Sequence, residues 1–249
     1  MRALRDVGLL FHRYLISMIR EPIWLASALV TPLLYLALFM PLLRPVTPPG
    51  TPVLNLFLPG ILSFVAYGSG VGPGFSLIFD LRVGVVERLR VTPASRLAIL
   101  AGPLLATMTE MLTFNAVLVA VGAALGFSVH WAGLVLLAAL LGVLQLGVAA
   151  FFAATALITK EINSFAAVAN GLNLPVLLLG GVLLPLTLGP LWLRVLAHID
   201  PLYYVVGAAR ALAAGHLGAA AVAEAFAVTV PLAAAVLAWA TGVLRRAVA

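Results

Sequence analysis

The sequence has no cysteine and little charge, and both absences narrow what the chain can be. Only 9% of its 249 residues are charged, whereas 64% are hydrophobic. A soluble domain carries roughly 25% charged residues, and here the polar residues are too few to cover a soluble globule. The lack of cysteine excludes a disulfide framework and a thiolate metal site. The composition therefore predicts an integral membrane protein.

Lysine is almost absent as well, since Lys160 is the only one, and the net charge of +6 comes from arginine. The arginines fall between apolar runs and form no basic patch on a soluble face, so we expect no nucleic-acid partner. The histidines also lack metal-ligand spacing, and none pairs with a serine as a protease site would require. They are His12, His130, His198 and His216. We expect neither a metal site nor an enzyme.

Six apolar runs are long enough to span a bilayer, which takes roughly 20 residues of helix. They predict an all-α membrane protein, and the first run is expected to be an uncleaved span. The runs are Ile23 to Leu43, Leu54 to Phe79, Leu97 to Phe127, Trp131 to Ile158, Phe165 to Leu184 and Val222 to Leu244.

The basic residues predict the orientation, because loops rich in lysine and arginine stay on the cytoplasmic side. Eleven of the 14 lysines and arginines fall at the termini and in the second and fourth loops, which are on one side if there are six spans. The other three are Arg44, Arg194 and Arg210. We therefore expect both termini in the cytoplasm of a bacterium or archaeon, with the chain in the inner membrane.

Two further segments are expected at the membrane surfaces. Residues 1–22 show apolar side chains every three or four positions with arginines opposite, which predicts an amphipathic helix on the inner surface. Residues 185–218 are apolar but broken by prolines and carry Trp192, Tyr203 and Tyr204. We expect one or two short helices there that dip into the outer leaflet, because aromatic residues of this kind favour the interface.

Several polar residues lie within the predicted spans and are candidates for a substrate pathway. Glu110 is in mid-span, where a charge is costly. It either binds a cationic substrate, relays a proton or pairs with another helix, or it is protonated or lies nearer the inner surface. The others are amides that either line a pathway or form a packing seam between helices. They are Gln145, Asn163, Asn170 and Asn173.

The glycine-rich run at 68–74 (GSGVGPG) lacks the Lys-Ser/Thr of a phosphate-binding loop. It predicts close helix packing or a flexible break within a span. We therefore expect no nucleotide site in this chain.

The most charged loop follows the second predicted span and contains the run ERLRVTPASR at 87–96. Apolar residues at 81, 85, 86 and 89 can share one face of a short helix at 81–91. Thr92-Pro93 then suits the start of the next helix. The loop is either a solvated, topology-setting segment or a docking surface, and its charged candidates are Arg82, Glu87, Arg88 and Arg90.

These motifs resemble type-2 ABC transporter permeases, the group that includes daunorubicin-resistance and nodulation exporters. The run at 87–96 is similar to the group's cytoplasmic loop, in which an acidic residue precedes a Thr-Pro-x-Ser-Arg-like sequence. The runs GGVLLP at 180–185, PLWL at 190–193 and DPLYY at 200–204, followed by Arg210, are similar to its outer segment. Asp200 stands where members of the group often have asparagine.

The resemblance implies one membrane subunit that pairs with a second copy and binds two separate ATPase subunits, which hold ATP and Mg. Residues 81–91 would then be a coupling helix, contacting the ATPase through Arg82, Glu87, Arg88 and Arg90. The expected activity is export of an amphipathic drug, lipid or lipid-linked glycan. Two alternatives remain open: an ion-coupled secondary transporter that uses Glu110, and a membrane scaffold that transports nothing.

Overall fold

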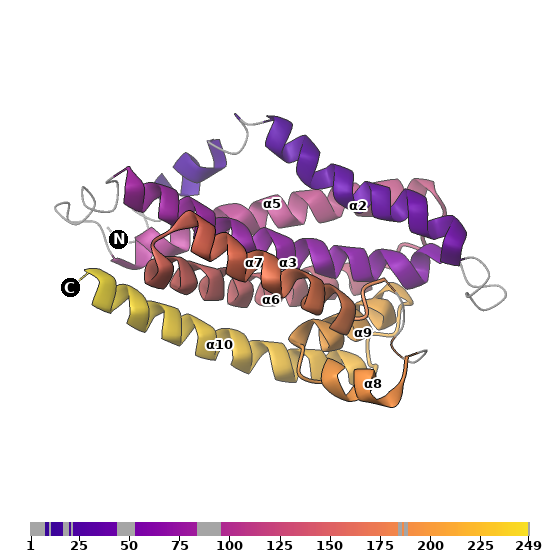
Figure 1. Cartoon of the computed structure of the whole chain (residues 1–249). Coiled ribbons are helices and arrows are strands. Elements are labelled where there is room, and N and C mark those ends of the chain that lie inside the picture. The colour runs from indigo at the N-terminus through magenta and orange to yellow at the C-terminus, as the bar shows by residue number, and fades with distance from the viewer. Residues whose placement is uncertain are drawn as a thin grey trace.

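The computed structural model describes residues 8–9, 11–16, 20, 22–43, 53–83, 96–183, 186 and 189–248. Regular structure in these ranges is entirely helical, which confirms the predicted all-α class (Figure 1). The helices are α2 (Pro22–Leu43), α3 (Val53–Arg82), α5 (Arg96–Ala124), α6 (Trp131–Thr159), α7 (Ile162–Leu179), α8 (Leu191–Ala197), α9 (Pro201–Ala213) and α10 (Ala220–Val248). Residues 8, 9 and 11–16, within the predicted amphipathic segment, are also helical.

Among the described residues, five helices are long and apolar enough to cross a membrane. They are Val53–Arg82, Gly102–Ala124, Trp131–Thr159, Ile162–Leu179 and Ala220–Arg246. The first predicted span corresponds to α2, which is 22 residues long and contains the shorter apolar stretch Leu29–Leu42. The count of six spans therefore stays a prediction, whereas a protein with several membrane-crossing helices is well supported.

One predicted span ends earlier than expected. The sequence suggested apolar helix up to Leu184, but α7 ends at Leu179. Gly180 and Gly181 follow, and Gly181 has a φ of 64° in the left-handed region, which terminates a helix at little cost only when the residue is glycine.

The centre of the bundle is α3, which packs against α2, α5, α6, α7 and α9. It runs without interruption through the glycine-rich segment 68–74, so this segment is not a break. A Cβ added to Gly70 would lie 2.7 Å from Val148 Cγ1, and one added to Gly74 would lie 2.3 Å from Phe165 Cζ. The glycines thus allow α6 and α7 to approach α3 closely, as the packing interpretation predicts.

The predicted outer segment contains the two short helices α8 and α9, joined by a corner at Asp200-Pro201. Asp200 Oδ1 accepts a hydrogen bond of 2.9 Å from the Leu202 N–H, and Pro201 takes the first helical position. This is a favourable helix start, since proline needs no partner for its nitrogen there. The apolar face of α9 packs against α3, α6 and α10. How deeply the pair sits in a membrane leaflet stays a prediction.

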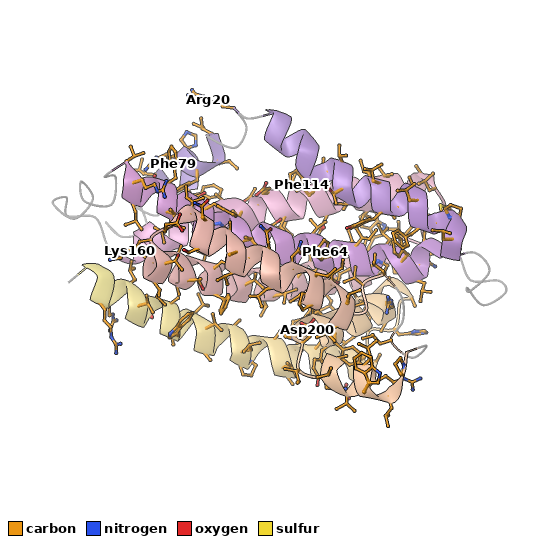
Figure 2. The ribbon with its side chains drawn as sticks, in the orientation of Figure 1. Arg20, Phe64, Phe79, Phe114, Lys160 and Asp200 are labelled. Atoms are coloured by element: carbon orange, nitrogen blue, oxygen red, sulfur yellow. The ribbon has the colours of Figure 1, made fainter. Side chains whose placement is uncertain are left out.

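The bundle has two ends (Figure 1), and their side chains differ chemically. The charged end comprises residues 8–9, 11–16 and 20, the end of α3, the turn between α6 and α7, and the end of α10. The hairpin end comprises the start of α3, the loop between α5 and α6, helices α8 and α9, and the start of α10. Figure 2 shows Phe79 and Lys160 at the charged end and Asp200 towards the hairpin end.

Candidate functional site

The charged end is organised around Asp80 in the last turn of α3. Its carboxylate is buried, with only 5% of the residue exposed. Arg13 Nη2 donates a hydrogen bond of 2.9 Å to Asp80 Oδ1, and the Tyr14 hydroxyl donates to Asp80 Oδ2. Because a buried carboxylate is costly unless it is paired, these bonds join the amphipathic segment firmly to α3.

Tyr14 is held in its protonated form by this arrangement. Burial is the main cause that raises the pKa of its hydroxyl, and the hydrogen bond to Asp80 raises it further. The hydroxyl therefore remains a donor at any physiological pH. The Arg13 guanidinium also lies 5.4 Å from the centre of the Tyr14 ring, within the range of a cation–π interaction.

The turn between α6 and α7 is the second charged feature of this end. Lys160 closes α6 with a φ of 53°, in the left-handed region. Glu161 then caps α7, accepting hydrogen bonds from the Asn163 N–H at 2.9 Å and the Ser164 N–H at 2.5 Å. The bond from Asn163, followed by those from Ser164, lowers the pKa of the Glu161 carboxylate. The turn is thus a short and well-capped joint.

Arg82 connects these features, because it is the last residue of α3 and points to the α6–α7 turn. Its Nη2 lies 4.0 Å from Glu161 Oε1, and both side chains are partly exposed. Arg82 thus pairs within the chain, as well as standing next to the charged loop. The other predicted coupling residues, Glu87, Arg88 and Arg90, lie outside the described residues.

The predicted pathway residues separate into two groups. Gln145 is fully buried on α6, where its Nε2 donates a 2.8 Å hydrogen bond to Thr107 Oγ1 of α5. It therefore belongs to a packing seam inside one chain. Glu110 is half-buried on α5 and forms no hydrogen bond or ion pair with the part of the chain that the structure describes.

The three asparagines are on the exposed surface of α7. At about 100° per residue, Asn163, Asn170 and Asn173 fall within an arc of about 80°. We call this surface the asparagine face. This face is exposed, whereas Gln145 is buried where α6 meets α5. The structure thus does not gather the five predicted pathway residues into one site.

The hairpin end contains a buried charge that sequence reasoning did not select as a functional candidate. Arg210 of α9 donates from Nε to the Leu56 carbonyl at 2.9 Å and from Nη2 to the Gly181 carbonyl at 2.7 Å. These bonds tie α9 to the start of α3 and to the end of α7. Burial lowers the pKa of Arg210 to about 10, so the guanidinium stays charged at neutral pH.

Sequence reasoning also missed Arg13, Tyr14, Asp80 and Glu161 as a connected group. One signal was available, because Asp80 is an ionisable residue at the end of a long apolar run. Its partners are 67 and 66 residues away in sequence, and no local pattern pairs residues at such a separation.

Comparison with known proteins identifies the class of this membrane protein. The ABC-2 type transporter family matches residues 5–213. A protein named as a transport permease, ycf38, of Cyanophora paradoxa is 31% identical over 217 residues, which is 84% of this chain and 74% of that protein. The daunorubicin resistance ABC transporter permease protein DrrB1 of Streptomyces coeruleorubidus is 26% identical over 200 residues, covering 79% of this chain and 71% of that protein.

The chain therefore belongs to the ABC-2 type transporter family, and the resemblance seen in its motifs is confirmed. It is a multi-pass membrane subunit of an ATP-binding cassette transporter, and it is a transport permease and not an enzyme. Permeases of this family work with an ATP-binding cassette subunit. Membership does not favour the ion-coupled secondary transporter as an alternative.

Proposed function

We propose that this chain is the permease of an exporter in which separate ATPase subunits move an amphipathic cargo out of the cytoplasm. The observation that carries the proposal is the connected group at the charged end. Residues flanking the charged loop 84–95 are bonded to the amphipathic segment through Asp80 and paired with the α6–α7 turn through Arg82. A force applied to that loop would therefore reach three elements together.

The coupling step follows from these contacts. ATP and Mg are bound by the ATPase subunits, whose closure displaces the loop that holds Glu87, Arg88 and Arg90. The end of α3 moves with the loop, because the two are continuous. Asp80 transmits the displacement to Arg13 and Tyr14, and the Arg82–Glu161 pair transmits it to the start of α7. Packed helices move as rigid bodies, so a small shift at one end reaches the other.

The pathway is proposed to lie between two copies of the chain, at the asparagine face of α7. Of the five candidate spans, α7 has the smallest buried share in the described chain. Amide side chains exposed to lipid would lack hydrogen-bond partners, at a cost of several kcal/mol each in the bilayer core. A second copy or a polar pathway satisfies them. Amphipathic cargo suits this surface, which combines the asparagines with exposed apolar side chains such as Leu174.

The native absence of cysteine makes the homodimer directly testable. Asn170→Cys should give a disulfide-linked dimer under mild oxidation in membranes, because equivalent asparagine faces would meet. Val135→Cys on α6 is the matched control, since this residue is 69% exposed but lies on a different surface. Equal cross-linking of both variants, or none with Asn170→Cys, would exclude α7 as the interface.

The coupling proposal is tested in proteoliposomes that contain the permease with its ATPase. Glu87→Ala and Arg88→Ala should lower ATP-dependent export about tenfold or more while the complex still assembles. Arg246→Ala provides the control, because Arg246 is an exposed arginine at the same end of the bundle. Unchanged export in both loop variants would overturn the assignment of the loop as the coupling element.

Glu110 separates this function from the ion-coupled alternative. Glu110→Gln removes the only acidic residue in the middle of a predicted span. ATP-driven export should persist in this variant, and wild-type export without the ATPase should be absent even with an imposed proton gradient. Gradient-driven transport that is lost in Glu110→Gln would instead support the secondary transporter. A complex whose ATPase activity no cargo stimulates, and which exports nothing, would point to the scaffold.

A further inference from the structure

A small pocket with a few polar side chains in its lining lies at the hairpin end, where the end of α7 meets α9 and the start of α10. Its volume is about 220 Å³. The residues that matter for its chemistry are Tyr203, Tyr204, Gly207, Arg210 and Glu224. The pocket is separate from the charged end and from the asparagine face.

Arg210 brings to this pocket a charge that no carboxylate pairs with in the part of the chain that the structure describes. Its Nε and Nη2 bond to backbone carbonyls, which accept hydrogen bonds but carry no full negative charge. Among the described residues the ion pairs are Arg13–Asp80 and Arg82–Glu161, and neither involves Arg210. A partly buried cation is unfavourable unless an anion accompanies it. Glu224 lines the same pocket but is exposed to solvent and forms no ion pair with Arg210.

The depth of the pocket indicates what kind of anion can reach it. The candidate span in α7 ends at Leu179, and that in α10 begins at Ala220. The pocket therefore lies where two spans leave the hydrocarbon layer, which is the level of lipid headgroups. Tyr203 and Tyr204 agree with this position, since tyrosine is enriched at the membrane interface. An anion at this level carries a phosphate in most membrane amphipaths.

We propose that this pocket binds the phosphate group of an amphipathic molecule in the headgroup layer, with Arg210 as its counter-ion. The guanidinium suits phosphate because its planar donors match two oxygens at once. Arg210 Nη1 takes no part in the two carbonyl bonds, and Nη2 has a second N–H, so these two nitrogens are available to the ligand. The Tyr203 hydroxyl can donate a further hydrogen bond, whereas that of Tyr204 already donates to the His198 carbonyl at 3.2 Å. The acyl chains extend towards the bilayer.

Gly207 allows the pocket to be filled without disturbing the fold. A Cβ added to this residue meets no atom within 4 Å, and the residue lines the pocket. Gly207→Leu should therefore occupy the ligand's space while leaving the bonds of Arg210 intact. Gly242→Leu is the matched control. Gly242 is also helical, a Cβ added to it also meets no atom within 4 Å, and it lies near the end of α10 that is far from the pocket. Arg210 itself is a poor first target, since its loss would also break the contacts that hold α9.

The test is a binding titration with the full-length chain in detergent. The probe is a short-chain phosphatidylglycerol with a fluorophore on one acyl chain, compared with diacylglycerol carrying the same fluorophore. We expect the phospholipid to bind about tenfold more tightly or better, a difference of about 1.4 kcal/mol. Gly207→Leu should remove most of this preference, whereas Gly242→Leu should leave it unchanged.

Two further measurements identify the source of the ligand and the sign of its charge. Inorganic phosphate should compete only weakly if the ligand is a lipid headgroup, whereas competition as strong as that of the lipid would assign the site to free phosphate. Glu224→Gln should strengthen binding about two- to threefold, because it removes a negative charge from the pocket that holds the anion. Equal affinity for phospholipid and diacylglycerol, unchanged binding in Gly207→Leu, or weaker binding in Glu224→Gln would overturn the proposal.

Discussion

The two ends of the bundle are held together in different ways. At the charged end, separate elements are joined by bonds between side chains, as in Arg13 with Asp80 and Arg82 with Glu161. At the hairpin end, side chains bond mainly to the backbone: Arg210 bonds to the carbonyls of Leu56 and Gly181. Asn55 adds a link there, accepting from the Ser128 N–H at 3.0 Å and donating to Ser128 Oγ at 3.1 Å.

This difference suggests a division between a moving end and an anchoring end. The Arg82–Glu161 pair is partly exposed and can separate to find water or another partner at small cost, whereas in the Arg13–Asp80 pair only the arginine is exposed. Backbone carbonyls buried beside a helix end have no such replacement, so breaking their bonds is expensive. We therefore expect changes at the charged end to affect coupling, and changes at the hairpin end to affect stability.

The largest effect is expected at Arg210. Arg210→Met leaves two backbone carbonyls without their charged donor, and each such hydrogen bond is worth roughly 1.5–3 kcal/mol. The free energy of unfolding should fall by about 3 kcal/mol or more, measured by SDS titration of the protein in micelles. Arg245→Met on the exposed end of α10 is the control and should have little effect. Similar stability in the two variants would contradict the prediction that Arg210 anchors the hairpin end.

Asp80→Asn should have the next largest effect, and mainly on transport. Asparagine can still accept from Tyr14 but no longer attracts Arg13, so the amphipathic segment is held less firmly. We expect ATP-dependent export to fall about tenfold, with a loss of stability of about 1–2 kcal/mol. Export rates and unfolding titrations measured on one preparation separate the two effects.

A double-mutant cycle of Arg13→Gln with Asp80→Asn sharpens this prediction. The pair should be coupled by about 0.5–1 kcal/mol, because Arg13 is partly exposed and the attraction is screened. Additive effects would mean that the two residues act separately and that Asp80 does not transmit force through Arg13.

Asn55→Ala tests the hairpin end with a smaller expected loss of stability than Arg210→Met. It removes the two hydrogen bonds to Ser128, so the stability should fall by about 1 kcal/mol while export per folded transporter is unchanged. A loss of export at constant stability would contradict the division between the two ends. Thermal unfolding in detergent, combined with export assays, measures both quantities.

The smallest effect is expected for the Arg82–Glu161 pair. Arg82→Gln should change stability too little to measure, because both side chains are partly exposed, while export becomes less sensitive to salt.

The hydrogen bonds by which Glu161 caps α7 should be visible in the dependence of stability on pH. Since its pKa is lower in the folded chain, their contribution is present above the ordinary carboxylate pKa of about 4.3 and is lost as pH falls further. Glu161→Gln should reduce this loss of stability at acid pH.

Much of the fold could be predicted from the sequence. Helix positions follow from long apolar runs, and the early end of α7 was missed only because Gly180-Gly181 stops a helix inside an apolar run that continues beyond it. The corner at Asp200-Pro201 was readable from the chain, since an acidic cap and a proline at the first position are local signals. The family followed from several short motifs in a fixed order.

The candidate site was less predictable, because its geometry depends on which helices are neighbours. Gln145 and the asparagines of α7 had the same signal in sequence, a polar residue in an apolar run. Packing placed Gln145 at 0% exposure beside Thr107 and left Asn170 on the surface. No periodicity within one helix distinguishes a face that meets a neighbour in the same chain from a face that is left open.

The sequence by itself determined that the chain is an all-helical membrane permease, because hydrophobicity, charge bias and capping are local properties. Only the tertiary structure decided which charges meet. Asp80 is paired with Arg13 because α3 and the amphipathic segment end side by side, and Arg210 is bound to two carbonyls because α9 lies between the ends of α3 and α7. Such contacts join residues far apart in the chain, so they exist only once the helices have packed.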